Sequence, residues 1–550
     1  MLLHLGRFAI DQPDFHGGFN AFGDTSMPTR KLCFARLEDR RLLTGDLPTL
    51  TLDDTTGFVV GVLGSEGGTD IYEVGDLNGD GLEDLGVGGL HYSLEEDTYI
   101  GSLHILFGNE EVPTSGSRST RFSDDYFDIY SLDGTNGFEM VGYYYAPSND
   151  PVAALGDVNG DGIDDLGIVR DTEGLTGYVD VLFGSREPFE ATLSQDDVRA
   201  SGFTIVQSGA FAGGTSSVGA GDINGDGLGD VIVGGKFNMG VSVIYGSETP
   251  ANELNVANLG PEEGFSLVVE DRKDYGYLDA ADVNGDGIED LLVASEIGDS
   301  AYVVFGSRDS LPTRIKPQDL NGSNGFSIRS MPSSQLIAVG DVNADGFEDI
   351  AIATVGPPVG KIQIVFGSAQ FDAIVDATDF SPSQGFVVEG SVAGPGDVNG
   401  DGFDDLLLGN PSIPGGSIYV LYGGPSIDGD VFTLTPSTGF GFAGRFGDMW
   451  NDQLGYAVSR LGDFNGDAFN DLFFRPQGIN GDYRAIVLLG RPSPVPGDAN
   501  GDGTTDFKDF LIFANNFGKE DAVFADGDFD GDGRVSFLDF LVLAGNFVAG

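Results

Sequence analysis

A nine-residue block, Asp-x-Asn-x-Asp-x-x-x-Asp, occurs seven times in this chain and constrains its fold more than any other feature. The copies begin at Asp76, Asp157, Asp222, Asp282, Asp341, Asp397 and Asp463, between 56 and 81 residues apart. A Gly-Phe pair precedes every copy, and an apolar run that ends in glycine follows every copy. Three features that keep the same order seven times indicate one structural unit, repeated.

Each unit contains four short segments that are rich in β-branched and aromatic residues. They are the Gly-Phe segment, the run into the block, the run out of it and the apolar run ending in glycine. No helical period appears between residues 47 and 491. Four antiparallel strands per unit, repeated around an axis, predict an all-β fold, a seven-bladed β-propeller of four-stranded blades. A solenoid is the structural alternative, although its repeats usually run ~20–50 residues.

The order of the segments indicates how such a ring closes. The repeated region opens with the Gly57-Phe58 segment and ends with the apolar run before Gly490. If the Gly-Phe segment is the outer strand of a blade, the N-terminal copy must complete the seventh blade. We therefore expect the two ends of the repeated region to pair.

The composition of the 550-residue chain excludes several classes of protein. Its 87 glycines show no Gly-X-Y period, so the chain is not collagen, and 40% hydrophobic residues suffice for a large core. Acidic residues outnumber basic ones 87 to 27, and a net charge of −60 repels phosphates. We expect no nucleic-acid partner, and hard cations are the natural counter-ions of so many carboxylates.

The repeated block has the residue types of a calcium loop. Positions 1, 3, 5 and 9 offer side-chain oxygens, position 7 offers a backbone carbonyl, and glycine at position 6 allows a sharp turn. One block alone is equally an ordinary Asp/Asn/Gly turn, but seven in register favour calcium. The predicted ligands are Asp76, Asn78, Asp80, Leu82, Asp84, Asp157, Asn159, Asp161, Ile163, Asp165, Asp222, Asn224, Asp226, Leu228, Asp230, Asp282, Asn284, Asp286, Ile288, Asp290, Asp341, Asn343, Asp345, Phe347, Asp349, Asp397, Asn399, Asp401, Phe403, Asp405, Asp463, Asn465, Asp467, Phe469 and Asp471.

Two copies of the block deviate. Ala344 replaces glycine at position 4, and Ala468 replaces glycine at position 6, where a positive φ makes a Cβ costly. We expect the seventh site to bind calcium most weakly. The ions are expected to brace each hairpin rather than to contact a ligand.

The seventh unit, with Arg445-Phe-Gly-Asp448, Leu454-Gly-Tyr-Ala-Val-Ser459 and Asp463-Phe-Asn465, resembles the FG-GAP repeat of integrin α-chain propellers. The resemblance covers residues 47–491. It implies an extracellular propeller that takes part in adhesion or binds a protein or a glycan.

A Pro-rich linker at residues 492–496 separates the repeats from a C-terminal part, residues 497–550, with a different pattern. Two twelve-residue loops of EF-hand type each run into an amphipathic helix, expected at 507–517 and 537–547. Their predicted calcium ligands, which raise the expected total to about nine ions, are Asp498, Asn500, Asp502, Thr504, Asp506, Asp509, Asp528, Asp530, Asp532, Arg534, Ser536 and Asp539.

This C-terminal part resembles a pair of type I dockerin repeats, a small helical, EF-hand-like domain. Dockerins commonly carry Ser-Thr at loop positions 10 and 11, but Phe507-Lys508 and Phe537-Leu538 stand there in this chain. Two partners remain open, a cohesin-like domain and a second copy of the module.

Within the first 46 residues, the stretch 30–43 is basic and amphipathic. Leu37-Glu-Asp-Arg-Arg-Leu-Leu43 resembles the leader of many extracellular proteins of planctomycete bacteria. We expect an export segment and a secreted or cell-surface protein, and a disordered basic arm is the alternative. The sequence contains no apolar run of about 18 residues, so we expect no membrane span. The single Cys33 allows no internal disulfide.

Catalytic residues are hard to find, and none is predicted. The repeats contain no cysteine and only two histidines, His91 and His104. His104 occupies a strand position that varies freely between units, and paired carboxylates of a glycosidase remain an alternative. Aromatic and basic residues on the face opposite the calcium loops are the types found in recognition sites, although each is as well suited to the core between blades. The predicted ligand-face residues are Tyr143, Tyr144, Tyr145, Arg272, Tyr275 and Trp450.

Three functions are compatible with these features. The chain is a non-catalytic, calcium-stabilised adhesion or interaction protein, a component of a polysaccharide-degrading system or a hydrolase, or a structural cell-surface protein. The first is favoured because a fold alone confers no chemistry.

Overall fold

The computed structural model describes residues 57–61, 71–93, 98–109, 127–128, 131–143, 151–170, 176–208, 215–235, 238–273, 275–295, 300–329, 334–354, 361–376, 381, 383–410, 417–425, 427, 439–443, 453–477, 484–490, 497, 499, 505–520, 522, 526–529 and 534–547. The predicted leader and the Pro-rich linker lie outside the described residues.

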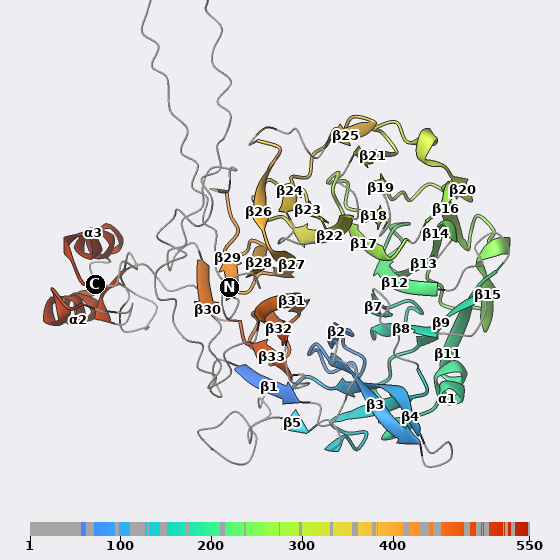
Figure 1. Ribbon diagram of the computed structural model, residues 1–550, viewed down its shortest axis with the longest axis horizontal. Coiled ribbons are helices and arrows are strands. Elements are labelled where there is room, and N and C mark those ends of the chain that lie inside the picture. The colour runs from blue at the N-terminus through green and yellow to red at the C-terminus, as the bar shows by residue number, and fades with distance from the viewer. Residues whose placement is uncertain are drawn as a thin grey trace, which may run out of the picture. The chain divides into compact units, whose positions relative to one another are not determined.

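Seven β-sheets surround a central axis, which confirms the predicted seven-bladed propeller (Figure 1). Blade 1 contains β2 (Ile71–Glu73), β3 (Leu85–Ser93), β4 (Thr98–Leu106) and β6 (Gly137–Val141). Blade 2 contains β7 (Val152–Gly156), β8 (Asp165–Arg170), β9 (Gly177–Leu182) and β11 (Gly202–Gln207). Blade 3 contains β12 (Thr215–Gly221), β13 (Asp230–Gly235), β14 (Asn238–Ile244) and β16 (Gly264–Lys273). Blade 4 contains β17 (Tyr277–Ala281), β18 (Asp290–Ala294), β19 (Ser300–Val304) and β21 (Gly325–Arg329).

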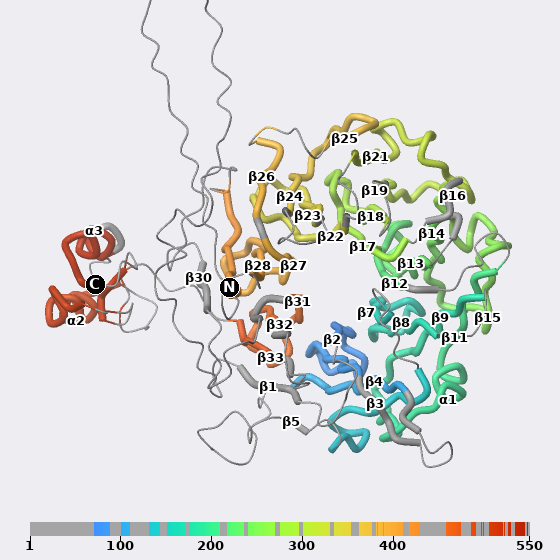
Figure 2. The backbone as a smooth tube through the Cα atoms, viewed as in Figure 1, coloured from blue at the N-terminus to red at the C-terminus, as the bar shows by residue number. Residues whose placement is uncertain are grey.

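The remaining blades repeat the same four-stranded antiparallel order. Blade 5 contains β22 (Ser334–Gly340), β23 (Asp349–Thr354), β24 (Lys361–Val365) and β26 (Gly385–Glu389). Blade 6 contains β27 (Ser391–Gly396), β28 (Asp405–Asn410), β29 (Ser417–Leu421) and β30 (Gly439–Ala443). Blade 7 contains β31 (Gln453–Leu461), β32 (Asp471–Gln477), β33 (Arg484–Leu488) and β1 (Gly57–Gly61). The first-named strand of each blade lies next to the axis (Figure 2).

The seventh blade is built from both ends of the repeated region, as the order of the segments predicts. Strand β1 pairs antiparallel with β33, and its register places Gly57 opposite Leu488 and Gly61 opposite Arg484. The N-terminal strand therefore supplies the fourth antiparallel strand of the last blade and closes the ring by main-chain hydrogen bonds.

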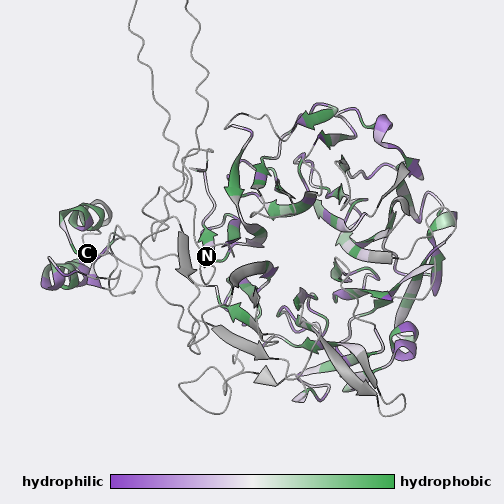
Figure 3. Cartoon of the chain, viewed as in Figure 1, coloured by the Kyte–Doolittle hydropathy of each residue, from purple (hydrophilic) through white to green (hydrophobic). Residues whose placement is uncertain are grey.

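The two features that recur beside the blocks, the Gly-Phe pair and the apolar run that ends in glycine, pack against each other in the hydrophobic core. The phenylalanine of the Gly-Phe pair is buried in blades 1 to 5, and it packs on the aromatic residue of the apolar run in the same blade. Phe326, for example, lies 6.0 Å from Phe305 and stacks on Phe371 at 4.3 Å between ring centroids. The hydrophobic residues concentrate along the strands (Figure 3). This aromatic packing explains why both features recur in the units that form blades 1 to 5.

The glycine of the Gly-Phe pair begins the outer strand where no side chain fits. Gly264 has a φ of 139°, and a Cβ there would lie 2.0 Å from the carbonyl oxygen of Val243. Only glycine satisfies both the dihedral angle and the close approach of the neighbouring strand.

A fifth short strand, which the sequence pattern did not reveal, pairs parallel with the outer strand in five sheets. These strands are β5 (Phe127–Asp128), β10 (Thr192–Leu193), β15 (Glu253–Asn255), β20 (Arg314–Ile315) and β25 (Ile374–Asp376). Each precedes the Gly-Phe strand of its own unit but pairs with the outer strand of the preceding blade, as Val60 with Phe127 in β5. Two or three residues are too few to show a period of two.

In the described part of the repeated region, where no helix was predicted, one α-helix and two 3₁₀ turns lie between the strands. Helix α1 (Gln195–Ala200) begins at a capping box in which Ser194 and Asp197 bond each other's backbone N–H groups. The 3₁₀ turns are η5 (Val256–Asn258) and η6 (Pro317–Asp319). A helix of six residues is too short for a 3.6-residue period to be recognised.

The C-terminal part contains α2 (Phe507–Asn516) and α3 (Phe537–Asn546), each one residue shorter than predicted. Their inward faces share a small core that contains Phe513, Phe529, Val535 and Leu543. Among the described residues, no helix combines the length and the apolar character that crossing a bilayer requires.

Replacing Phe326 by alanine tests the aromatic packing. Phe326 is fully buried, and its loss leaves a cavity against Phe305 and Phe371, so we expect a loss of about 3–5 kcal/mol in the free energy of unfolding. The control is Ile374→Ala, because that side chain is 55% exposed. Urea unfolding followed by far-ultraviolet circular dichroism measures both, and equal losses would contradict the assignment of Phe326 to the core.

Candidate metal loops and axial cavity

The seven acidic blocks form the turns between the innermost and second strands of the seven blades. Position 1 lies at the head of each turn, and its carboxylate accepts backbone N–H groups from positions 5 and 6. In blade 5, Asp341 accepts from Asp345 at 3.0 Å and from Gly346 at 2.8 Å. The corresponding two bonds occur in all seven loops. The block therefore folds on its own local hydrogen bonds, as Asx turns do.

The side chains at positions 3 and 5 turn toward each other. Asp345 accepts the N–H of Phe347 at position 7, and Asn343 donates its amide to Asp345 at 3.0 Å. In blade 4, the amide of Asn284 instead reaches Asp290 at position 9, at 3.0 Å. These amide bonds tie the side chain at position 3 to a carboxylate of its own loop.

Position 9 is a buried aspartate that joins the turn to the third strand. Asp349 is fully buried and accepts N–H groups from Val342 at 3.1 Å and from Gly367 at 2.9 Å. Gly367 ends the apolar run of its unit, and a Cβ there would lie 2.5 Å from the carbonyl oxygen of Glu348. The glycine that follows every block thus supplies a backbone donor to the last aspartate of that block.

Burial raises the pKa of these aspartates, and the carboxylates at positions 1 and 5 raise it further. The pKa of Asp165 is raised to about 7 and that of Asp349 to about 8. The same shift to about 8 holds for Asp230, Asp290, Asp405 and Asp471. The charged form of each loop is therefore costly unless a positive charge compensates it.

The donor set fits a hard cation in its chemistry, since each loop offers three carboxylates, one amide oxygen and one carbonyl. In the described part of the chain, however, no three carboxylate, imidazole or thiol groups are gathered into a metal-ligating group. The predicted calcium ligands are thus placed in one turn per blade without forming a closed coordination shell.

The backbone of the two deviating loops is strained. Ala468 at position 6 has a φ of 71°, as predicted, and Ala344 at position 4 has a φ of 61°. The glycines at both positions of other loops are also positive, for example Gly79 at 69° and Gly81 at 92°. The strain at position 4 was not recognised from the sequence.

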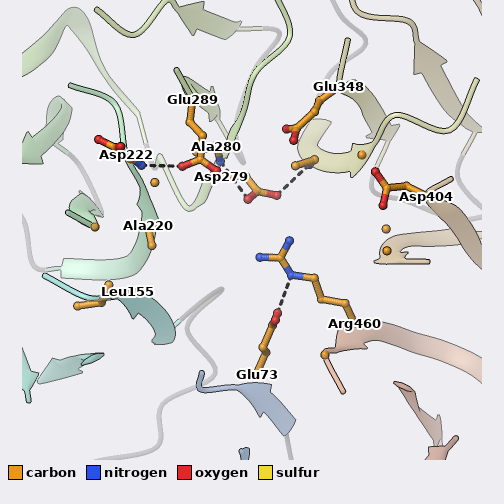
Figure 4. A pocket seen from close by; sticks show the side chains of 18 of the residues that line it. Glu73, Leu155, Ala220, Asp222, Asp279, Ala280, Glu289, Glu348, Asp404 and Arg460 are labelled. Carbon is orange, nitrogen blue, oxygen red and sulfur yellow. Dashed lines mark hydrogen bonds and ion pairs between the residues drawn. The ribbon is translucent and has the colours of Figure 1, made fainter. Parts of the chain in front are cut away.

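A cavity of about 610 Å³ lies on the propeller axis beside the loops (Figure 4). Its only cation among the described lining residues is Arg460 of β31, whose Nε donates to Glu73 of β2 at 2.6 Å and joins blade 7 to blade 1. Asp279 of β17 lies at the equivalent strand position and accepts the N–H of Ala338 at 2.8 Å. The ring of acids around Arg460 makes the cavity strongly negative.

The eighth residue of the block supplies half of this acidic lining. These residues, to which no role was assigned from the sequence, are Glu83, Glu289, Glu348 and Asp404. Burial raises the pKa of Glu83 to about 7, and it raises the pKa of the other three as well. The visible signal was an acid at position 8 in five of the seven blocks.

Two residues of the predicted ligand face lie in the core, so their assignment was wrong. Tyr143 is 5% exposed, packs between blades, and donates to the buried Asp180 at 3.4 Å. Tyr275 is fully buried in the core of blades 3 and 4. Burial of their rings removes more apolar area from water than exposure on a face would allow. Tyr144, Tyr145, Trp450 and the side chain of Arg272 lie outside the described part.

His104 has polar partners, but they do not form a nucleophilic triad. Its Nε2 lies 3.0 Å from Ser102 Oγ and 3.8 Å from Glu139 Oε1, and the ring is 1% exposed. A triad requires the hydroxyl and the carboxylate on opposite ring nitrogens. His104 is thus a core residue with polar neighbours.

In the C-terminal loops, positions 9 and 12 form helix caps. Asp506 caps α2 while Asp509 accepts the N–H of Asp506 at 2.8 Å, and Ser536 and Asp539 repeat this arrangement at α3. Asp509 and Asp539 are fully buried, and Asp528 is nearly so. The other predicted ligands of these loops lie outside the described residues, except Arg534, which pairs with Glu520 at 3.0 Å. The remaining residues are Asp498, Asn500, Asp502, Thr504, Asp530 and Asp532.

The FG-GAP repeat family matches residues 390–421, which include the acidic block of blade 6. Integrin alpha-4 of Xenopus laevis is 29% identical over 29% of this chain and 16% of its own length. Human integrin alpha-6 is 27% identical over 34% of this chain and 16% of its own length. Human phosphatidylinositol-glycan-specific phospholipase D is 26% identical over 39% of this chain and 26% of its own length. The similarity covers well under a third of each relative, and it supports an FG-GAP propeller similar to that of integrin alpha chains.

Replacing Ala468 by glycine tests the backbone strain in the seventh loop. A left-handed conformation costs a residue with a Cβ about 1–2 kcal/mol, so Ala468→Gly should stabilise the protein despite the added chain entropy. The contrasting variant is Ala351→Gly in β23, where glycine should cost about 1 kcal/mol. Thermal unfolding measures the melting temperatures of both variants. A lower melting temperature for Ala468→Gly would contradict the inference that Ala468 is strained.

Proposed function

We propose that this protein is an extracellular, calcium-binding and non-catalytic interaction protein, whose propeller serves adhesion to a protein or a glycan. The observation that carries the proposal is the repetition of one oxygen-rich turn in every blade of an integrin-alpha-like FG-GAP propeller. Seven turns with the same oxygen-bearing residues at positions 1, 3, 5 and 9 are more than a fold requires and suit a common counter-ion.

Calcium is the cofactor that the loops favour. A bound ion supplies positive charge to a group of carboxylates and links positions 1, 3, 5, 7 and 9 of one turn. Within each turn, the buried aspartate at position 9 is the group whose charge is most costly without such an ion. Ions in these turns would brace the innermost hairpin of each blade. The two C-terminal loops add the remaining predicted sites, for a total of about nine.

The partner of the propeller is proposed to bind the face opposite the calcium loops. Tyr144, Tyr145, Arg272 and Trp450 remain the candidates for this surface, since Tyr143 and Tyr275 are buried. Aromatic and Arg side chains are the residue types that contribute most to recognition of proteins and glycans.

The C-terminal helices are proposed to dock a second partner, either a cohesin-like domain or another copy of the module. Both helices expose large apolar side chains at equivalent positions, with Phe507 61% and Phe537 62% exposed. Leu511 and Leu541 follow one turn later and are 47% and 52% exposed. Exposed apolar patches of this kind mark interaction surfaces.

Calcium binding is tested by counting the ions on the full-length protein. After exhaustive chelation and reloading, elemental analysis should find about nine calcium ions per chain, one for each predicted loop. Calcium at about 100 times the dissociation constant should add ~2.7 kcal/mol of stability for each independent site. Fewer than six ions per chain would contradict the assignment of the repeated block.

The interaction role is tested with beads coated with the purified protein. The beads should bind to immobilised glycans or cell surfaces in calcium and detach in EDTA. The double variant Tyr144→Ala, Trp450→Ala should weaken binding at least about tenfold, as loss of recognition hot spots does. The control Glu187→Ala changes an exposed acid and should have no effect. Release of reducing sugar from the bound glycans would contradict the non-catalytic role and favour a hydrolase.

A further inference from the structure

The eighth residue of the block reaches across to the neighbouring blade. In four of the seven junctions, its carboxylate accepts the backbone N–H of position 1 in the preceding block. Glu289 accepts from Asp222 at 2.6 Å, and Figure 4 shows this bond beside the axial cavity. The same bond joins Asp164 to Asp76, Glu348 to Asp282, and Asp404 to Asp341.

A backbone bond runs in the opposite direction at several junctions. The N–H of Glu348 donates to the carbonyl of Asp282 at 3.1 Å, while the N–H of Asp282 donates to the Glu348 carboxylate at 2.9 Å. The junction between blades 4 and 5 therefore has a reciprocal pair of bonds. The two bonds therefore engage both the N–H and the carbonyl of Asp282, the first residue of its loop.

The residue before position 1 leaves room for this carboxylate. A Cβ at Gly340 would lie 2.2 Å from Asp404 Oδ2, and a Cβ at Gly75 would lie 2.8 Å from Asp164 Cβ. Gly340 and Gly75 also have positive φ values of 73° and 77°. At these two junctions the glycine makes room for the acid of the next blade. Glycine and acid do not always occur together, because Ala281 precedes Asp282 opposite Glu348, and Gly156 precedes the block that faces Gly229.

Three junctions lack the carboxylate bond. Gly229 and Asn470 replace the acid in blades 3 and 7, and each donates only its backbone N–H to the preceding block, at 2.9 and 3.1 Å. Glu83 donates its N–H to the carbonyl of Asp463 at 3.1 Å, but its Oε2 is buried without a hydrogen-bond partner. The series of carboxylate bonds is continuous only from blade 3 to blade 6.

We propose that the position-8 acid is an inter-blade positioning residue, which fixes the first oxygen donor of the preceding loop and so couples the ion sites of neighbouring blades. The contact orders the peptide of position 1, whose own side chain organises positions 5 and 6. A loop whose first donor is held in place loses less conformational freedom when it binds an ion. Coupling is strongest from blade 3 to blade 6 and weakest for Asp157, which faces Gly229. The calcium part of this inference rests on the proposed function.

The test compares Glu348→Ala with Glu348→Gln in the full-length protein. The Gln amide oxygen can still accept the N–H of Asp282, whereas Ala cannot. Because the Ala variant loses this hydrogen bond, calorimetry should find one calcium site weakened about tenfold in the Ala variant and largely restored in the Gln variant. Glu187→Ala removes the same charge at an exposed position and should leave all affinities unchanged.

Hydrogen–deuterium exchange in EDTA tests the contact without any metal. The peptide that contains Asp282 should exchange at least about tenfold faster in Glu348→Ala than in the parent protein, and near the parent rate in Glu348→Gln. Glu289→Ala and Glu289→Gln, read at Asp222, provide the same comparison if Glu348→Ala does not fold.

The outcomes separate the two proposals. If the parent protein binds no calcium, the proposed cofactor is wrong, while the exchange rates still test the contact. If the parent binds calcium but the Ala variant keeps both its affinities and its exchange rate, the positioning role is wrong. Equal weakening by Ala and Gln would show that only the charge matters, which also overturns the inference.

Discussion

Each blade depends on one buried aspartate, the ninth residue of the repeated block. Its two carboxylate oxygens accept backbone N–H groups from the start of the turn and from the glycine at the end of the third strand, as Asp405 does from Val398 and Gly423. These bonds fasten the innermost hairpin to the strand that carries the core aromatic residue. Because a buried and unpaired N–H costs ~1–3 kcal/mol, no apolar residue can replace the aspartate cheaply. The same burial makes its negative charge costly, and a cation bound in the oxygen-rich turn would offset this cost.

The ring brings these acidic turns together around one axis. Acids from several blades line the axial cavity and surround Arg460, whose bond to Glu73 lies at the junction of the last blade with the first. In the outer part of that seventh blade, β1 pairs with β33. The ring is therefore closed in two places, by strand pairing in its outer part and by an ion pair near its axis. Main-chain bonds from position 8 to position 1 connect blades 2 and 3, blades 4 and 5, and blades 6 and 7, and the bond from Glu83 to Asp463 adds to the closure between blades 7 and 1.

Much of the fold follows from the sequence because every unit repeats the same local signals. The four strands, the seven blades, the pairing of β1 with β33 and the positive φ of Ala468 were all predictable from spacing and residue type. The short fifth strands and α1 were missed because so few residues carry no recognisable period. The axial cavity was missed because Glu73, Asp279 and Arg460 lie in different units and share a surface only after the ring closes. Tyr143 and Tyr275 were placed on a face because sequence alone does not separate a recognition aromatic from one that fills the core between blades.

The central claim is that each turn holds a cation against its buried aspartate. A crystal structure of the protein grown with calcium, with anomalous diffraction data, tests this claim most directly. The account predicts one anomalous peak in the turn of every blade, coordinated by positions 1, 3, 5, 7 and 9, with the bonds of the ninth residue to the backbone kept. Turns that keep these bonds but show no anomalous peak at saturating calcium would contradict it, since the buried carboxylates would then need no counter-ion.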